Sequence, residues 1–371
     1  MKKLQQLLLP HIHQLLESET KAQALETPKA KVLLYNNESP YNTPNNRFPE
    51  KRASRLYEAL SRQRKIRQDC IFATEGLDHL FSLFLRLFCA PSLDNIVVAA
   101  PSSPLVSRQA AWHNITCLTI NLGEHFCFSA DDVLAACDEH TKLIYLCSPN
   151  DISGLCFEPK EIVKLLAQFE GIVLIDESYI DFSSQKTLLP AIEEHSNAVI
   201  IQTFSYAWAS AGLNLYVAYG VPELINYLQQ IAAPQGINTP TVTQTLQILS
   251  RPVDAHKWTQ QIIEERGRLI PALQLLPFCE KVYPSEANFV LIRTSEAEKL
   301  HAYLKARGIK VLFLPQLFPQ HDFLRITVGL PNENVALLGA LRTYRSYGLF
   351  SRLIGKCCVM TWHRSSRAKG A

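Results

Sequence analysis

Glycine is scarce in this chain, and the glycine-rich motifs of nucleotide-binding proteins are missing. Only 14 of the 371 residues are glycine, where an average usage of about 7% would give about 26. The chain contains neither GxGxxG nor GxxxxGK[ST], so no dinucleotide-binding Rossmann motif and no P-loop is predicted. An excess of positive charge is also missing, because 37 Lys and Arg face 34 Asp and Glu. Without surplus cations to neutralise phosphates, the composition argues against a nucleic-acid-binding protein.

Long apolar runs and paired cysteines are absent as well. No uninterrupted run of 18 apolar residues occurs, so no membrane-spanning helix is expected. The ten cysteines are scattered without a CxxC pair, and Gln5, Gln6 and His11 interrupt the apolar run that a secretory signal would need. We therefore expect reduced thiols in a cytoplasmic protein. With 47% hydrophobic and 19% charged residues, the composition is that of a folded globular protein.

Short apolar runs alternate with helical patterns between residues 70 and 220. Seven runs are predicted as strands, at residues 70–73, 96–100, 115–120, 143–147, 172–175, 199–203 and 215–220. Helix-length segments such as 77–88 and 159–169 separate several of them. This alternation predicts an α/β fold with a mostly parallel seven-stranded sheet covered on both faces. Ligands of such sheets bind beyond the carboxyl ends of the strands.

The pattern changes after Pro252. A smaller α+β domain is predicted from helices at 256–276, 296–308 and 333–344 and from strand-like segments at 281–294, 310–315 and 323–329. We therefore divide the chain into an N-terminal helix and arm (1–50), a large domain (51–250), a small domain (251–344) and a basic tail (345–371). The last 26 residues carry five basic residues and no acidic one. This tail is expected to be poorly ordered, or sequence acquired by a frame change, with a membrane-surface or nucleic-acid contact as the weaker alternative.

The first residues predict an amphipathic helix. Its apolar face is formed by Leu4, Leu7, Leu8, Ile12, Leu15 and Leu16. Pro10 predicts a kink within this helix. Because an apolar face needs a surface to bury it, we expect it to pack against a partner.

The strongest chemical signal lies at two predicted strand ends. The segment VLIDESYID places Asp176 at the end of a buried strand with Tyr179 three residues later, although an aspartate there can also be a helix cap. A second strand ends in TFSYAW (203–208) and is followed by AGLN (211–214). Together with SPNDISG (148–154), these segments resemble the fold-type I pyridoxal-phosphate-dependent aminotransferases, in particular the histidinol-phosphate aminotransferase family. The resemblance runs to about Tyr344 and includes residues 35–50, 282–293 and 323–342.

The resemblance implies roles for individual residues. An aspartate pairs with the pyridine nitrogen of pyridoxal 5'-phosphate, which matches Asp176, and a tyrosine that bonds its phenolic oxygen matches Tyr179. Arg325 matches the arginine that binds the substrate carboxylate, with Asn288 beside that pocket. Further cofactor contacts are implied at Gly76, Leu77 and Ser205. Gly76 and Leu77 begin a helix whose N-terminus could receive the phosphate, with His79 where the family usually has glutamate.

Several positions depart from the family pattern. Tyr206 stands where the resemblance implies the lysine that holds the cofactor covalently, and a phenol can neither form that link nor move the substrate proton as the lysine does. Lys186 and Lys142 are the nearest lysines in sequence. At the other departures, Asp151 replaces an asparagine of the family and Asn214 replaces a phosphate-binding arginine. Phe48 replaces a tyrosine that reaches the site from the neighbouring subunit, and residues 102–106 replace a segment whose aromatic ring stacks on the cofactor.

Three hypotheses follow. The first is a catalytically degenerate aminotransferase that binds the cofactor weakly or not at all, and not covalently. The second is an active transaminase of the histidinol phosphate and 2-oxoglutarate type with a non-standard base. The third is a non-catalytic module that binds a small anionic metabolite through Arg325 and the helix at Gly76. In each case we expect a homodimer, because the resemblance implies that the arm at 35–50 reaches the neighbouring subunit's active site, and no nucleic-acid or membrane partner.

Overall fold

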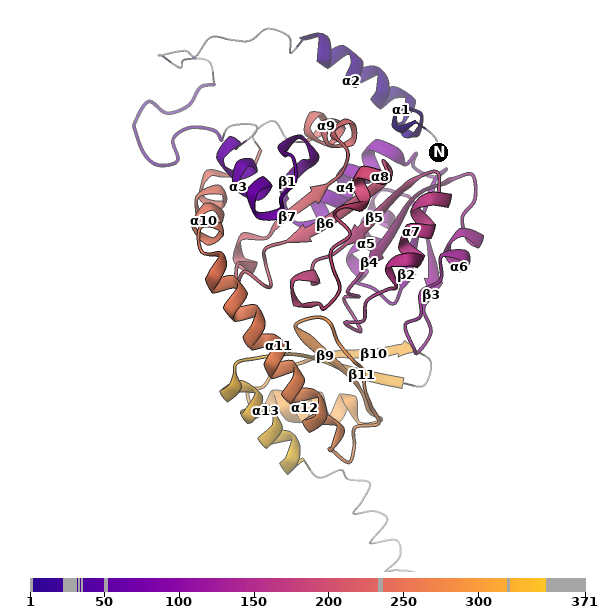
Figure 1. Ribbon diagram of the computed structural model, residues 1–371, viewed down its shortest axis with the longest axis vertical. Coiled ribbons are helices and arrows are strands. Elements are labelled where there is room, and N and C mark those ends of the chain that lie inside the picture. Colours follow the sequence, from indigo (N-terminus) through magenta and orange to yellow (C-terminus); the bar gives the residue numbers. More distant parts are fainter. Residues whose placement is uncertain are drawn as a thin grey trace, which may run out of the picture. The chain divides into compact units, whose positions relative to one another are not determined.

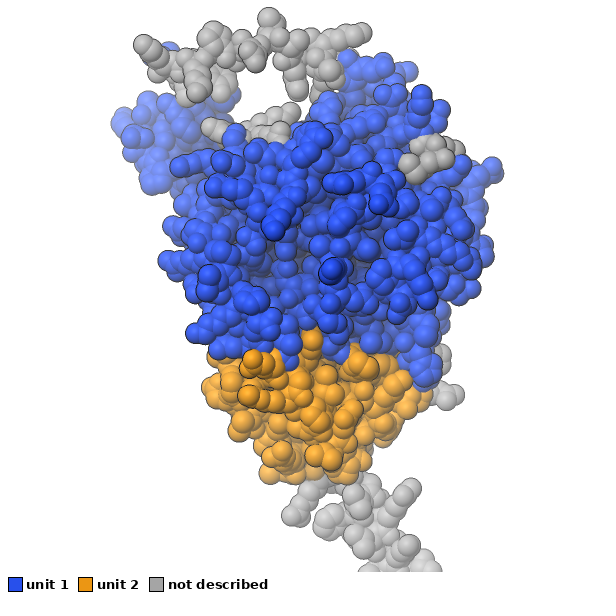
Figure 2. All heavy atoms as spheres, in the orientation of Figure 1, with its two compact units in different colours: residues 1–263, 285–288 blue, residues 264–284, 289–371 orange. Residues whose placement is uncertain are grey.

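The structure, a computed structural model, describes residues 3–22, 32, 34, 36–49, 53–232, 236–318 and 321–344. The chain forms two compact units, residues 1–263 with 285–288 and residues 264–284 with 289–371 (Figure 2). The division predicted at residues 50, 250 and 344 remains a prediction. The basic tail at 345–371 lies outside the described residues.

The first unit contains a seven-stranded sheet in the order β1-β7-β6-β5-β4-β2-β3 (Figure 1). Its strands are β1 Ile71–Glu75, β2 Asn95–Ala100, β3 Thr116–Asn121, β4 Thr141–Cys147, β5 Ile172–Asp176, β6 Ala198–Thr203 and β7 Leu215–Tyr219. β2 to β6 pair in parallel, whereas β7 is antiparallel to both of its neighbours, β1 and β6. The predicted α/β class and all seven predicted strands are confirmed.

Helices cover this sheet because its central strands are mostly apolar and buried along their whole length. β5 and β6 are buried at every residue, which requires packing on both faces. The helices are α3 Ser54–Arg64, α4 Leu77–Phe88, α5 Pro104–Trp112, α6 Ala130–Ala135, α7 Pro159–Gln168, α8 Ala191–Glu194, α9 Pro222–Ile231 and α10 Thr239–Leu249. Short 3-10 turns lie at Gln68–Cys70, Ile180–Phe182 and Ala211–Leu213. α4 matches the predicted helix at 77–88, and its Phe81, Phe84 and Leu87 are fully buried.

The N-terminal segment forms two helices, α1 Leu4–Leu7 and α2 Pro10–Ala22. The predicted single kinked helix is therefore wrong, because Pro10 begins α2, where its missing N–H costs no hydrogen bond. Leu4, Leu8 and Leu16 are buried in the core of the first unit, and the Leu9 N–H donates to the Leu87 carbonyl at 3.0 Å. This part of the apolar face is covered by its own chain, while Leu15 is 56% exposed. Leu4, Leu8 and Leu16 therefore need no partner to bury them, whereas the expected packing of the exposed Leu15 against a partner remains a prediction.

The second unit contains a four-stranded antiparallel sheet in the order β10-β11-β9-β8. Its strands are β8 Lys281–Val282, β9 Phe289–Arg293, β10 Leu312–Phe318 and β11 His321–Thr327, and its helices are α12 Ala297–Ala306 and α13 Pro331–Thr343. α11 Pro252–Gln274 contains the boundary between the units. The predicted strand segment at 281–294 is split in two, and Pro284, which has no N–H to donate to a ladder, lies in the interruption. Among the described residues, no helix has the length and apolarity needed to span a bilayer.

Candidate functional site

Asp176 ends β5 at the carboxyl edge of the sheet and is 2% exposed. Its Oδ2 accepts a hydrogen bond from the Tyr145 hydroxyl at 2.6 Å, and its Oδ1 accepts from the Ser178 N–H at 2.9 Å and from the Ser178 hydroxyl. Burial raises the pKa of Asp176, and the bonds from Ser178 and Tyr145 oppose that rise. The two oxygens of this buried carboxylate are thus both satisfied from within the chain.

Tyr179 and Tyr206 follow the neighbouring strands β5 and β6 and stack on one another. Their ring centroids are 4.8 Å apart and their planes differ by 9°. Tyr179 is 8% exposed, and burial, together with the charge and hydrogen bond of Tyr206, raises its pKa well above the usual value. Burial also raises the pKa of Tyr216 on β7, and Asp176 and Tyr206 add to that rise. The carboxylate of Asp176 therefore lies near Tyr145 and Tyr216, whose raised pKa values keep both phenols neutral at physiological pH.

The turn that carries Tyr206 is held by hydrogen bonds at both ends. The Ser205 N–H donates to the Thr203 hydroxyl at 3.1 Å, and the Ser210 hydroxyl donates to the Phe204 carbonyl at 2.6 Å. The Trp208 indole N–H donates to Asp181 at 3.2 Å. Asp181 also forms a two-pronged ion pair with Arg64 of α3 at 2.9 and 3.0 Å. This ion pair, the Arg64–Asp181 clamp, ties the turns after β5 and β6 to α3.

Asp151 turns its carboxylate toward the start of α5. It is 9% exposed and accepts a hydrogen bond from the Ser103 N–H at 2.6 Å and from the Ser102 hydroxyl at 3.1 Å. Ser103 is the N-cap of α5, and its own hydroxyl accepts from the Leu105 N–H at 3.3 Å. A carboxylate is favourable there because the N-terminus of a helix carries partial positive charge.

Gly76 is the N-cap of α4 and has a φ of 83°, a positive value that glycine adopts without strain. The Gly76 N–H donates to the Asn214 carbonyl at 2.7 Å. The side chain of Asp78 lies against the glycine, since a Cβ at residue 76 would be 2.3 Å from its Oδ1. Leu77 is half-buried and Asn214 is exposed. The helix start that was expected to receive a phosphate is thus lined by an acidic side chain and a carbonyl oxygen.

Three further predicted residues come from other elements. Arg325 lies on β11 of the second unit, with its guanidinium 4.8 Å from the centre of the Phe289 ring. Asn288 is half-buried in the segment 285–288 of the first unit. Phe48 is 55% exposed, and its N–H donates to Glu38 at 2.7 Å. The roles predicted for these residues, as for the others, remain predictions.

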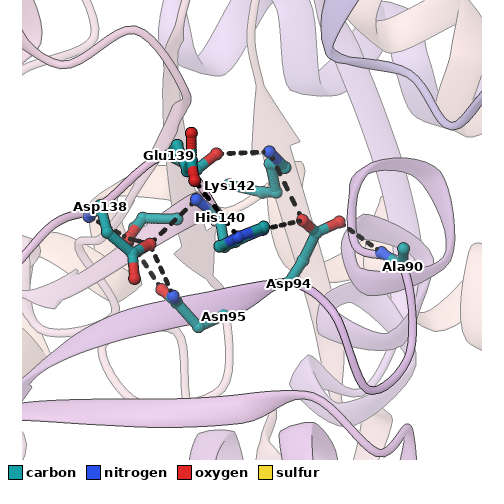
Figure 3. Close-up of polar contacts among 8 residues, drawn as sticks. Ala90, Asp94, Asn95, Asp138, Glu139, His140 and Lys142 are labelled. Carbon is teal, nitrogen blue, oxygen red and sulfur yellow. Dashed lines mark hydrogen bonds and ion pairs between the residues drawn. The ribbon is translucent and has the colours of Figure 1, made fainter.

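Lys142 lies at the amino end of β4, as Figure 3 shows. Its Nζ is 3.4 Å from the buried carboxylate of Asp94 and donates to the Glu139 carbonyl at 2.9 Å. Tyr206 follows the carboxyl end of β6, which runs in the same direction as β4, so the two residues lie at opposite edges of the sheet. Lys186 is exposed, and none of the described contacts of Asp176, Tyr179 and Tyr206 involves a lysine.

Tyr145, Tyr216 and the Arg64–Asp181 clamp were not predicted from the sequence. Tyr145 could have been found, because side chains alternate along a strand and residue 145 shares a face with residue 147, which pairs with Asp176. Arg64 and Asp181 are separated by 117 residues, and no local pattern links them. The described residues contain no group of His, Cys, Asp or Glu that could hold a metal ion.

A family model for class I and II aminotransferases matches residues 25–339. The chain belongs to this family. A histidinol-phosphate aminotransferase of Bacteroides fragilis is 36% identical over 345 residues, which cover 93% of this chain and all of the relative. A histidinol-phosphate aminotransferase of Parabacteroides distasonis is 37% identical, over 85% of this chain and 92% of its own.

Solved aminotransferase structures share the fold. The histidinol-phosphate aminotransferase of Clostridium acetobutylicum superposes with a TM-score of 0.72 at 21% identity, over 80% of this chain and 89% of its own. That of Sinorhizobium meliloti, solved in complex with pyridoxal-5'-phosphate, also has a TM-score of 0.72, at 19% identity over 80% of this chain and 83% of its own. The predicted fold-type I architecture is confirmed, and pyridoxal phosphate is the cofactor of this aminotransferase family.

The residues of the site fit this cofactor only in part. Asp176 and Tyr179 offer the carboxylate and the hydroxyl that a pyridine ring and its phenolic oxygen would need. The described contacts offer neither an amine beside them nor a cation beside Gly76. The set therefore does not fit a covalently held pyridoxal phosphate.

Proposed function

We propose that this chain is an aminotransferase-family protein that has lost transamination. The observation that carries the proposal is the stacking of Tyr206 on Tyr179, with ring centroids 4.8 Å apart. Tyr206 stands where the family resemblance implies the lysine, and its ring is fixed in a packed position by Tyr179. A phenol has no amine with which to hold the cofactor, and Tyr179 is kept neutral by burial.

Two departures from the family pattern compensate one another, which supports the proposal. Asp151 replaces the expected asparagine, and residues 102–106 replace the expected aromatic segment. The Asp151 carboxylate accepts hydrogen bonds from the Ser102 hydroxyl and the Ser103 N–H. Bonds to a charged group contribute about 1.5–3 kcal/mol each. These residues stabilise one another without a cofactor, as expected for a chain that folds and persists without it.

The phosphate end of the expected cofactor site also supports weak or lost binding. The Asp78 carboxylate lies against Gly76, and the Gly76 N–H is bonded to the Asn214 carbonyl. Among the described contacts of Gly76, a phosphate would meet a negative side chain and no arginine. Losing a charge-assisted phosphate contact weakens binding by about 1.5–3 kcal/mol, or roughly one to two orders of magnitude. The Asp78 carboxylate would also repel a small anionic metabolite at this helix, so it disfavours the hypothesis of a non-catalytic anion-binding module.

The deciding experiment is a titration of the purified protein with pyridoxal phosphate, followed by borohydride reduction and mass spectrometry. We expect no visible band of a lysine-bound cofactor, no added mass after reduction, and no half-transamination of glutamate. Tyr206→Phe is the matched control, because it keeps the ring and should behave like the wild type. A cofactor fixed to any lysine by borohydride would overturn the proposal.

One observation favours an active enzyme as the second candidate. The similarity to named histidinol-phosphate aminotransferases covers 93% of this chain and the full length of one relative. An active chain would need another base in place of Tyr206. Turnover of histidinol phosphate with 2-oxoglutarate that disappears when Lys186 is replaced by methionine, but not when Lys142 is, would establish this alternative.

We also propose that the chain forms a homodimer in the cytoplasm. The arm at residues 36–49 exposes large rings, Tyr41 at 79% and Phe48 at 55%, and the family resemblance implies that this arm contacts a second copy. Sedimentation at micromolar concentration should give about twice the chain mass of 41.9 kDa. A stable monomer would contradict the proposal.

A further inference from the structure

A cavity of about 360 Å³ lies within the first unit, beside the amino-terminal part of α4. It is lined by residues of α3, β1, α4 and α9 and of the segment before α10, namely Ala53, Tyr57, Phe72, Ala73, Thr74, Glu75, His79, Asn226, Gln229, Gln230, Ala232, Gly236 and Ile237. Ligand pockets of proteins occupy roughly 300–1,000 Å³. This cavity is therefore large enough for a small metabolite.

The charge of the lining selects among ligands. Glu75 is the one acidic residue among the lining residues, and neither lysine nor arginine is among them. Both hydrogen bonds that Glu75 accepts from Asn238 end on its Oε1, so Oε2 keeps its capacity to accept. An anion placed here would meet the Glu75 carboxylate and, among the described lining residues, no compensating cation, whereas a cation or a neutral donor would be attracted.

The other lining residues favour a planar ligand with polar groups. Tyr57 and Phe72 supply aromatic surface, and the hydroxyl of Tyr57 is held by the Ala73 N–H at 3.2 Å. His79 binds the Thr74 hydroxyl through Nδ1 at 2.8 Å, which leaves Nε2 for another partner. The side-chain amides of Asn226 and Gln229 add donors and acceptors. An apolar wall with a few polar groups is typical of a small-molecule site.

We propose that this cavity is a binding site for a small planar cation or hydrogen-bond donor, of the amidine or aromatic-amide class. The site is separate from the contacts of Asp176, Tyr179 and Tyr206, so it does not depend on whether the chain transaminates. Its preference is opposite in sign to that of a phosphate-binding site. All of its lining residues belong to one compact unit.

Three probes of nearly equal shape test the proposal: benzamidine, benzamide and benzoate. Titration calorimetry and saturation-transfer NMR on the full chain should show benzamidine binding with a dissociation constant of about 1 mM, as expected for a ligand of this size. Benzamide should bind a few-fold more weakly and benzoate at least about 10-fold more weakly. Hydrogen exchange should slow in β1 and α9 on benzamidine binding and stay unchanged in β3.

A conservative variant locates the charge. Glu75→Gln keeps the size and the acceptor for Asn238, and it should reduce the preference for benzamidine over benzamide by about 5-fold, the effect of one nearby charge in a water-like medium. Glu58→Gln on the exposed side of α3 is the matched control and should leave the preference unchanged. The proposal is overturned if benzamidine shows no saturable binding at 10-fold above the expected constant, if benzoate binds best, or if binding protects β3 instead of β1 and α9.

Discussion

The hydroxyl of Tyr145 on β4 donates a 2.6 Å hydrogen bond to Oδ2 of Asp176 at the end of β5. Both groups are almost fully buried, at 1% and 2% exposure. Burial raises the pKa of Asp176, and burial with the nearby Asp176 charge raises that of Tyr145. The hydrogen bond from the neutral Tyr145 phenol therefore offsets part of the free-energy cost of burying the Asp176 carboxylate.

Asp176→Asn should stabilise the protein at neutral pH. A raised carboxyl pKa in the folded state means that ionisation costs stability as the pH rises from the ordinary value of 3.8 through the raised pKa. The asparagine Oδ1 can still accept from Ser178, and its amide can donate to Tyr145. Urea unfolding between pH 3.5 and 8 should show a difference from wild type that grows with pH.

Asp138→Asn provides a control of opposite sign. Hydrogen bonds, first that from Asn95, lower the pKa of Asp138, so its contribution is present above the ordinary carboxyl pKa and is lost as the pH falls. This variant should be less stable than wild type at neutral pH and equal to it in acid. The same pH trend for both variants would show that burial does not govern Asp176.

Tyr206→Lys alone should not restore transamination. The variant would regain the amine. Asn214, however, carries no charge with which to bind the cofactor phosphate, and Asp151 would still place a carboxylate where the phenolic oxygen of the cofactor is expected. Activity should require Tyr206→Lys, Asn214→Arg and Asp151→Asn together, with non-additive effects because all three would act on one bound molecule. Half-transamination of glutamate is the measurement. Ordinary turnover by the single variant would mean that the rest of the site is intact.

Arg64→Met should destabilise the fold strongly. The Arg64–Asp181 clamp is largely buried, with side-chain exposures of 13% and 23%, and removing one partner of a buried pair costs about 3–5 kcal/mol. Part of the loss should appear as freer motion of Tyr206, because Trp208 shares the Asp181 carboxylate. Thermal unfolding and tyrosine fluorescence test this.

Arg67→Met is the matched control for that variant. The side chain of Arg67 is 75% exposed and pairs with Asp69, and exposed pairs contribute about 0–1 kcal/mol. Equal losses for Arg64→Met and Arg67→Met would contradict the clamp.

Leu8→Ala should cost about 2–4 kcal/mol of stability, because Leu8 is 6% exposed and packs in the core of the first unit. Leu15→Ala, at a position that is 56% exposed, should cost less than about 0.5 kcal/mol. Chemical unfolding at two protein concentrations separates folding from association. A strong concentration dependence of the Leu8 effect would show that this leucine packs against a second copy after all.

The sequence by itself determined the seven strands of the large sheet and the placement of Asp176 and Tyr206 at strand ends. Continuous apolar runs can be buried only when helices cover both faces of a sheet. Parallel strands then bring their carboxyl ends to one edge, so residues 30 positions apart become neighbours. This logic, together with the family resemblance, predicts that Tyr179, Tyr206 and Asp151 belong to one site, and the structure stacks the rings of Tyr179 and Tyr206.

Only the tertiary structure decided what those side chains contact. The apolar leucines of α1 and α2 indicated that a surface would cover them, but amphipathicity cannot distinguish the same chain from a partner. Asp151 accepts a hydrogen bond from Ser103, which is 48 residues away in the sequence. Arg64 pairs with Asp181, which is 117 residues away. Such pairings depend on how distant segments pack, and the cavity beside Glu75 exists only because four elements and one loop leave a space between them. Local sequence patterns cannot predict this cavity, because its volume depends on the packing of residues that are far apart in the chain.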